Sequence, residues 1–176
     1  MIGELSFFFG LQIIQTAEGL FLSQETYLKE ILKRFQMEDS STIITPMVVG
    51  CKLRNDDVSH DVDQRTYQSM IGSLLYITPS HPDIMQVFGM VGRFQYAPKE
   101  SHLAVVKMIF KYLKGIMTYG LWYPRNQKFQ LTVYSDVDRE NCLDERKSTS
   151  GGAFFLGDSL VSWLSKKQSS IALSTT

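Results

Sequence analysis

LSFFFGLQI, at residues 5–13, is the first stretch of this chain with a clear structural period. Apolar residues occupy every odd-numbered position in it, which is the period of a β-strand with one buried face. A turn at residues 17–19 and the apolar residues 20–22 predict a return strand, and hence a β-hairpin. Residues 28–35 carry apolar side chains at helical spacing, so a helix is predicted after the hairpin.

The middle of the chain changes from a polar linker to helices. Residues 39–63 show no clear period, which predicts a linker. Three amphipathic helical patterns follow: one begins near Tyr67, one at Pro82, and one near Pro98 that ends at Gly115. Because each pattern has a single apolar face, we expect a small helical bundle.

After Gly120 the pattern indicates strands. They are predicted at residues 120–123, 129–136, 152–156 and 160–164, with a turn at Gly157 and Asp158. The sequence therefore predicts an α+β fold in four segments. These are a hairpin and helix (1–38), a linker (39–63), a helical region (64–118) and a strand-rich segment (119–176).

Composition indicates a soluble globular protein that stays inside the cell. Of the 176 residues, 44% are hydrophobic and 20% charged, and the net charge of zero gives no indication for a polyanionic partner. Cys51 and Cys142 are too few and too far apart for a disulfide framework. No stretch approaches the roughly 18 apolar residues of a membrane span.

The charges are unevenly distributed along the chain. Residues 98–128 carry six basic side chains and one acidic one, whereas residues 129–158 carry six acidic and three basic ones. This order fits a phosphate-facing surface next to a cation site, and it also fits two ordinary solvated faces.

Several blocks of consecutive residues resemble the Pol polyproteins of Ty1/copia-type retrotransposons. The part that follows the polymerase active site of their reverse transcriptase is similar to residues 3–13 and 21–27, and the helical region after it to residues 67–76, 81–84, 98–103 and 112–115. The opening of the attached ribonuclease H (RNase H) domain is similar to residues 134–138, 146–151, 155–157, 161–163, 165–168 and 172–175. Only the 39–63 linker shows little similarity to the family.

The resemblance implies an arrangement of three parts. It implies a primer-grip-like hairpin and helix at the end of the polymerase palm (1–38), a thumb-like helical bundle (64–118), and an incomplete RNase H-like mixed sheet (119–176). In a whole polyprotein these parts serve RNA-directed DNA synthesis and the degradation of RNA in RNA–DNA hybrids.

The first hairpin is expected to contact nucleic acid. A Phe-Leu-Gly stretch in this family resembles the primer grip, and the residues at that place here are Phe8, Phe9 and Gly10. The alternative is that Phe7, Phe9 and Leu11 fill a core and that Gly10 marks a bulge.

Asp136 ends an apolar strand where RNase H-like domains place their first metal ligand, so the resemblance implies Asp136 as a catalytic residue and a ligand of Mg²⁺ or Mn²⁺. Two-metal hydrolysis needs about three or four carboxylates. The sequence lacks the family's Tyr-x-Asp-Asp polymerase motif and ends before its second RNase H carboxylate, and Arg139-Glu140-Asn141 replaces an aromatic-Ala-Gly stretch. We therefore expect a truncated fragment with an incomplete site, no bound metal and neither activity alone.

The last predicted helix carries Lys107, Lys111 and Lys114 along one side. Such a row suits the neutralisation of phosphates in an RNA–DNA hybrid or a primer–template duplex, and it also suits a plain solvated face. No membrane partner is expected. We expect self-association through the sheet face that a missing helix leaves uncovered. The alternatives to a polymerase fragment are a non-catalytic nucleic-acid-binding module and a degenerate retroelement remnant without function.

Overall fold

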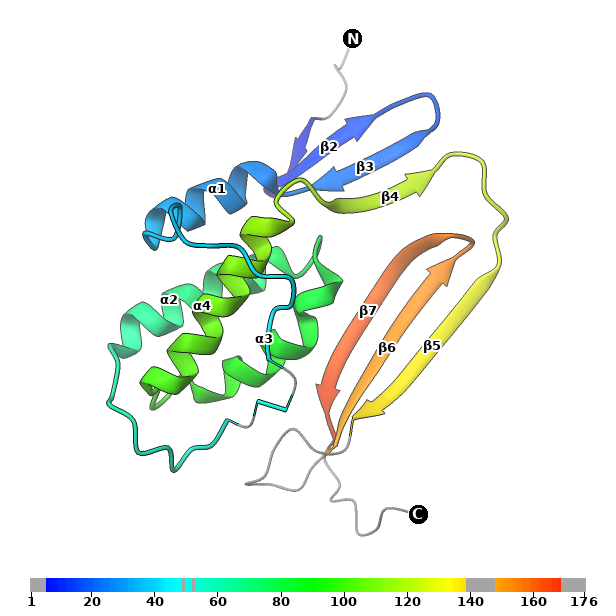
Figure 1. Cartoon of the computed structure of the whole chain (residues 1–176). Coiled ribbons are helices and arrows are strands. Elements are labelled where there is room, and N and C mark those ends of the chain that lie inside the picture. Colours follow the sequence, from blue (N-terminus) through cyan, green and yellow to red (C-terminus); the bar gives the residue numbers. More distant parts are fainter. Residues whose placement is uncertain (1–5, 49, 52, 139–147, 169–176) are drawn as a thin grey trace.

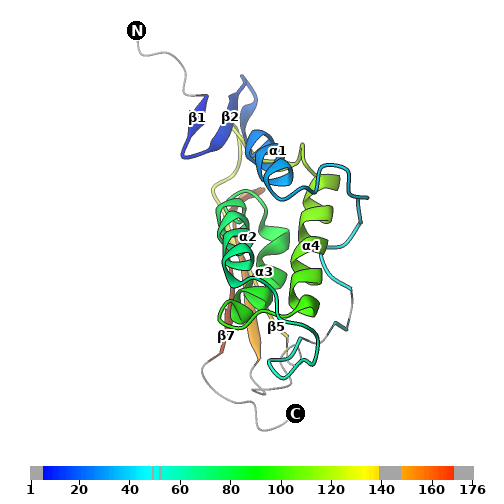
Figure 2. The same ribbon diagram turned by 90° about the vertical axis from the view of Figure 1, so that its left-hand side faces the viewer.

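The computed structural model describes residues 6–48, 50–51, 53–138 and 148–168, which form two antiparallel sheets and a layer of helices (Figure 1). The first sheet has the order β1-β2-β3-β4, with β1 at Phe7–Phe8, β2 at Leu11–Gln15, β3 at Gly19–Ser23 and β4 at Gly120–Pro124. The second sheet has the order β5-β6-β7, with β5 at Leu131–Asp138, β6 at Thr149–Leu156 and β7 at Ser159–Lys167. In the view turned by 90°, the helices lie in front of the second sheet and cover one of its faces (Figure 2).

The single strand predicted over residues 5–13 is wrong, because the chain reverses inside it. Phe8 at the end of β1 pairs with Leu11 at the start of β2, which leaves a turn of two residues, Phe9 and Gly10. Their φ angles are 47° and 75°. Turns with positive φ at both central residues match the right-handed twist of the flanking strands. The apolar alternation continues through the turn and hides it in the sequence.

The helical patterns are confirmed. Helix α1 spans Glu25–Arg34 and buries Leu28, Ile31 and Leu32. The other helical elements are α2 at Gln64–Ile77, η1 at Pro82–Ile84, α3 at Met85–Val91, η2 at Gly92–Phe94 and α4 at Glu100–Gly115. α2 begins where the Asp63 carboxylate accepts a hydrogen bond from the Thr66 N–H at 2.7 Å, which also lowers the pKa of Asp63.

One hydrophobic core joins the four α-helices. Its fully buried side chains include Leu28, Tyr67, Leu74, Ile109, Phe110 and Leu113. The Tyr67 hydroxyl donates to the Val91 carbonyl at 2.8 Å, so this buried polar group is satisfied. Burial raises the pKa of Tyr67 well above its ordinary value. Among the described residues, no helix is long and apolar enough to cross a membrane.

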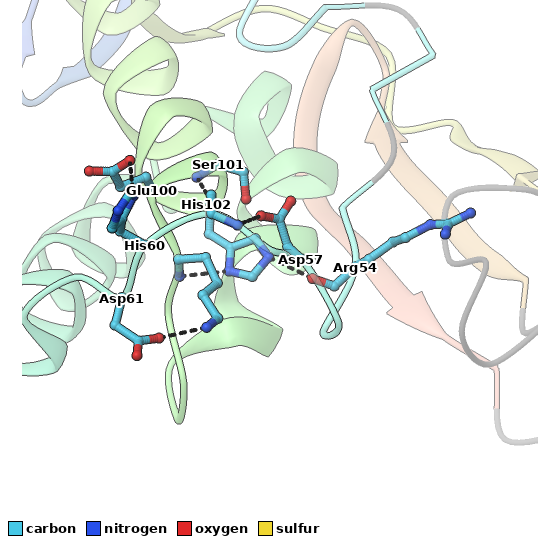
Figure 3. A network of polar contacts seen from close by, with 9 residues as sticks. Arg54, Asp57, His60, Asp61, Glu100, Ser101 and His102 are labelled. Carbon is cyan, nitrogen blue, oxygen red and sulfur yellow. Dashed lines mark hydrogen bonds and ion pairs between the residues drawn. The ribbon is translucent and has the colours of Figure 1, made fainter.

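The 39–63 segment forms no helix or strand among its described residues, but its second half docks onto the start of α4 (Figure 3). The first N–H groups of a helix lack partners within the helix. Here the His60 carbonyl accepts from Glu100 N–H at 2.9 Å, and the Ser59 hydroxyl accepts from Ser101 N–H at 3.3 Å. The Lys99 ammonium pairs with the Asp61 carboxylate at 2.7 Å, which lowers the pKa of Asp61.

His102 completes this docking from the buried side of α4. Its Nδ1 accepts a hydrogen bond from Lys99 N–H at 3.1 Å, so the other ring nitrogen carries the proton and donates to the Arg54 carbonyl at 2.9 Å. The ring stacks on Phe94 with 3.8 Å between centroids. Burial lowers the pKa of His102.

The strands after α4 divide between the two sheets. The sequence grouped residues 120–123 with the later strands, but β4 pairs with β3, from Ser23 opposite Gly120 to Gly19 opposite Pro124. Every strand pair among the described residues is antiparallel, so the parallel pair of the predicted mixed sheet is not found in this part of the chain.

The second sheet packs one face on the helices and leaves apolar side chains exposed on the other. The Trp163 indole N–H donates to the Thr78 carbonyl at the end of α2, at 3.1 Å. Leu131, Val133 and Leu164 share the opposite face by their register and are 43–64% exposed. Self-association through this face stays a prediction.

Candidate nucleic-acid interface

The turn between β1 and β2 is held in place by Tyr76 of α2. The Tyr76 hydroxyl donates a hydrogen bond to the Phe9 carbonyl. A Cβ on Gly10 would lie 2.7 Å from Cε1 and 2.9 Å from Cζ of the same tyrosine ring. Glycine is thus required at position 10 both for its positive φ and for the close approach of Tyr76.

The aromatic side chains of this turn face solvent. Phe8 is 52% exposed and Phe9 is 78% exposed, and their rings meet edge to face with 4.6 Å between centroids. Phe7 is 54% exposed. The alternative in which Phe7 and Phe9 fill a core therefore does not fit the structure. The predicted residues Phe8, Phe9 and Gly10 do come together, as an aromatic tip whose backbone is fixed by a neighbouring helix.

The predicted lysine row lies on α4, but its three members differ. Lys114 Nζ donates to the carbonyls of Glu38 and, at 2.6 Å, Ser40, so it anchors the chain after α1. Lys107 is exposed and Lys111 half-buried. Neither of these two makes a hydrogen bond or an ion pair within the part of the chain that the structure describes. Of the three lysines in this row, Lys107 and Lys111 are therefore the ones available for phosphates.

Asp136 lies exposed on β5, at a cleft of about 310 Å³ between the second sheet and α3. Gly151 is its partner across the sheet, and Gln86 of α3 lines the same cleft. Within residues 6–138 and 148–168, apart from 49 and 52, no group of three His, Cys, Asp or Glu side chains could hold a metal ion. A two-metal site for Mg²⁺ or Mn²⁺ is therefore not formed by the described residues. The Arg139-Glu140-Asn141 stretch lies outside them.

Sequence reasoning missed the residues around the aromatic tip. Tyr76 falls in a block that resembles the family, but nothing in its spacing shows that its hydroxyl reaches a turn far away in sequence. Tyr27 meets Tyr76 edge to face at 4.8 Å between centroids, and Arg34 Nη2 donates to Ser69 Oγ at 3.0 Å. Each of these contacts joins α1 to α2, and the linker separates the two helices in sequence. No local sequence pattern therefore predicts such contacts.

Several known proteins with similar sequences are transposon products. The retrovirus-related Pol polyprotein from transposon RE1 of Arabidopsis thaliana is 33% identical over 98% of this chain, and the one from transposon TNT 1-94 of Nicotiana tabacum is 33% identical over 99% of it. An uncharacterized mitochondrial protein of Arabidopsis thaliana is 31% identical, over 99% of this chain and 72% of its own length. No protein-family model and no solved structure matches.

The similarity to the polyproteins covers a small part of each of them. This chain spans 12% of the RE1 polyprotein and 14% of the TNT 1-94 polyprotein. Within that part it matches from one end to the other, in agreement with the blocks found in the sequence. The chain therefore belongs to the family of retrovirus-related Pol polyproteins of Ty1/copia-type transposons.

Proposed function

We propose that this chain is the part of a Pol polyprotein that joins the end of the reverse transcriptase to the start of RNase H, and that it contacts nucleic acid without catalysing a reaction by itself. The order of the blocks supports this assignment, since those that resemble the reverse transcriptase precede those that resemble RNase H. The expected partner is an RNA–DNA hybrid or a primer–template duplex.

The observation that carries the proposal is the exposed aromatic tip at Phe8 and Phe9. The apolar surface that Phe8 and Phe9 still expose gains nothing from folding. Tyr76 fixes the backbone of this turn, so little conformational entropy is lost when the turn binds a partner. Aromatic faces stack on bases or sugars of any sequence, as a sequence-independent grip requires.

Lys107 and Lys111 supply the charge that such a grip needs. Each ammonium that neutralises a phosphate releases counterions and adds about 0.9 to the slope of log affinity against log salt for duplex DNA. Lys114 is committed to the backbone carbonyls of residues 38 and 40, so it is not expected to add to that slope.

Fluorescence anisotropy with a labelled RNA–DNA hybrid at several salt concentrations tests the proposal. We expect Phe9→Ala to weaken binding about thirtyfold, the middle of the range for a lost stacking contact. Phe129→Ala is the matched control, because Phe129 is 83% exposed and lies apart from the tip in sequence. Equal affinities of these two variants, or binding that does not depend on salt, would contradict the proposal.

A cleavage assay tests the non-catalytic part. With Mg²⁺ or Mn²⁺ and an RNA–DNA hybrid, we expect no hydrolysis by this chain, because the described residues form no group of three metal-ligating side chains and one carboxylate cannot hold two divalent ions. Metal-dependent cleavage that Asp136→Asn abolishes would overturn this expectation.

A further inference from the structure

Beside the aromatic tip, α1 and α2 border an open cleft whose α1 and α2 residues the proposed duplex contact does not use. The two helices run antiparallel, since Tyr27 meets Tyr76 at one end and Arg34 meets Ser69 at the other. The cleft has a volume of about 620 Å³, and the hairpin adds Phe7 and Gly10 to its wall.

One end of the cleft is aromatic and fixed. The Tyr27 and Tyr76 rings lie at 62° to each other. Both hydroxyls are occupied, since Tyr76 donates to the Phe9 carbonyl and Tyr27 donates to the Ser73 carbonyl at 3.5 Å. Phe7 adds a third ring that is 54% exposed. The two tyrosine rings are fixed surfaces on which a flat ligand can stack.

The rest of the cleft is polar. Glu30 and Arg34 lie one turn apart on α1 and both line it. Arg34 is held by Ser69 Oγ at 3.0 Å and keeps further N–H donors. The Glu30 carboxylate forms no hydrogen bond or ion pair with any described residue. A hydrogen-bond acceptor and a donor thus lie one helical turn apart along the cleft, with Glu30 between the tyrosine end and Arg34.

The side of the cleft that α2 forms has a position without a side chain, which leaves room for a ligand. Gly72 lies on it, and a Cβ built there meets no heavy atom within 4 Å. Gly72 is exposed in the middle of a helix, where glycine is unfavourable by about 1 kcal/mol relative to alanine. The cleft therefore has open space at a position where a larger residue would favour the helix.

We propose that this cleft binds an unpaired nucleobase that carries an exocyclic amino group. The base stacks against the tyrosine end, its amino group donates to Glu30, and a ring nitrogen or carbonyl oxygen accepts from Arg34. An apolar peptide side chain would form no hydrogen bond with the Glu30 carboxylate or with the remaining N–H donors of Arg34. The inference rests on the proposed contact with nucleic acid and adds a second site, specific for single-stranded bases.

Titration of fluorescent 2-aminopurine, as the free riboside and within a short single-stranded DNA, tests the cleft in the full chain. We expect a saturable fluorescence change with both probes. Gly72→Leu fills the space and is expected to weaken binding of both at least about fivefold, the lower end for a lost stacking contact. Gly89→Leu is the matched control, since Gly89 lies on α3 with no heavy atom within 4 Å of its Cβ position and does not line the cleft.

Glu30→Ala supplies a second variant at an exposed position, with a similar loss expected. Wild-type affinity in both Gly72→Leu and Glu30→Ala would overturn the inference, as would the lack of a saturable signal. If hybrid binding still depends on Phe9 and Lys107 in that case, only the cleft assignment fails. If 2-aminopurine binds the natural chain and binds Gly72→Leu more weakly, while the hybrid does not bind at all, only the proposed duplex contact fails.

Discussion

Replacing Gly10 by alanine perturbs the hairpin turn in two separable ways. The backbone at Gly10 has a φ of 75°, where an L-residue with a Cβ costs about 1 kcal/mol. The new Cβ also lies 2.7 Å from Tyr76 Cε1, so the tyrosine ring has to move. Its movement breaks the hydrogen bond to the Phe9 carbonyl, which is worth about 1 kcal/mol. We therefore expect Gly10→Ala to lower the free energy of unfolding by about 2 kcal/mol.

Urea unfolding of matched variants separates the two contributions. Gly50 has a φ of 77° with no heavy atom within 4 Å of its Cβ position, so Gly50→Ala carries only the backbone cost of about 1 kcal/mol. In a Tyr76→Ala background, Gly10→Ala is also expected to cost about 1 kcal/mol, because the ring is gone. Equal losses for Gly10→Ala and Gly50→Ala in the natural background would refute the role of Tyr76 in holding the turn.

Further predictions concern pH, the lysine row and the contact between the layers. Burial lowers the pKa of His102, so its contribution to stability is full above the ordinary histidine pKa of about 6.5 and is lost as the pH falls through the lowered value. In urea unfolding, His102→Asn should therefore lose less free energy of unfolding between pH 7 and pH 5 than the natural chain does. The loss that remains in this variant is expected to come from the buried His81, whose pKa burial also lowers. Lys114→Ala should lower the free energy of unfolding by about 1–2 kcal/mol and Lys107→Ala by less than about 0.5 kcal/mol, since only the first loses hydrogen bonds; similar losses in thermal unfolding would contradict the anchoring role. Trp163→Phe should cost about 1 kcal/mol by the same measurement, because it leaves the Thr78 carbonyl without its donor, and an unchanged stability would show that this bond contributes nothing.

The helices were predictable because their signal is local. The apolar spacing at Leu28, Ile31 and Leu32 gives the buried face of α1 directly, and Gly115 gives the end of α4. Tertiary packing agrees with these local preferences, so no competing interaction shifts the elements. The segment boundary at residue 63 coincides with the Asp63 cap of α2 for the same reason.

The rest depends on partners that lie far away in sequence. The reversal at Phe9 and Gly10 keeps the apolar alternation intact, so the period of a strand and that of a tight hairpin cannot be distinguished there. β4 has the composition of the later strands, and only its pairing with β3 places it in the first sheet. Lys114 belongs to a regular row of three, yet two backbone carbonyls after α1 remove it from the candidate interface.

The pairing of β3 with β4 also has a consequence for biosynthesis. β3 is synthesised before β4, and all of the described helices lie between them in sequence, which gives a delay on the order of ten seconds at usual rates of translation. During that interval β3 is an open edge to which a strand of another nascent chain can add. Gly19 and Gly120 allow the final closure, because a Cβ on either would lie 2.9 Å from an atom of the opposite strand. A larger residue at either position would therefore lengthen the period in which neighbouring chains on one messenger RNA can exchange strands.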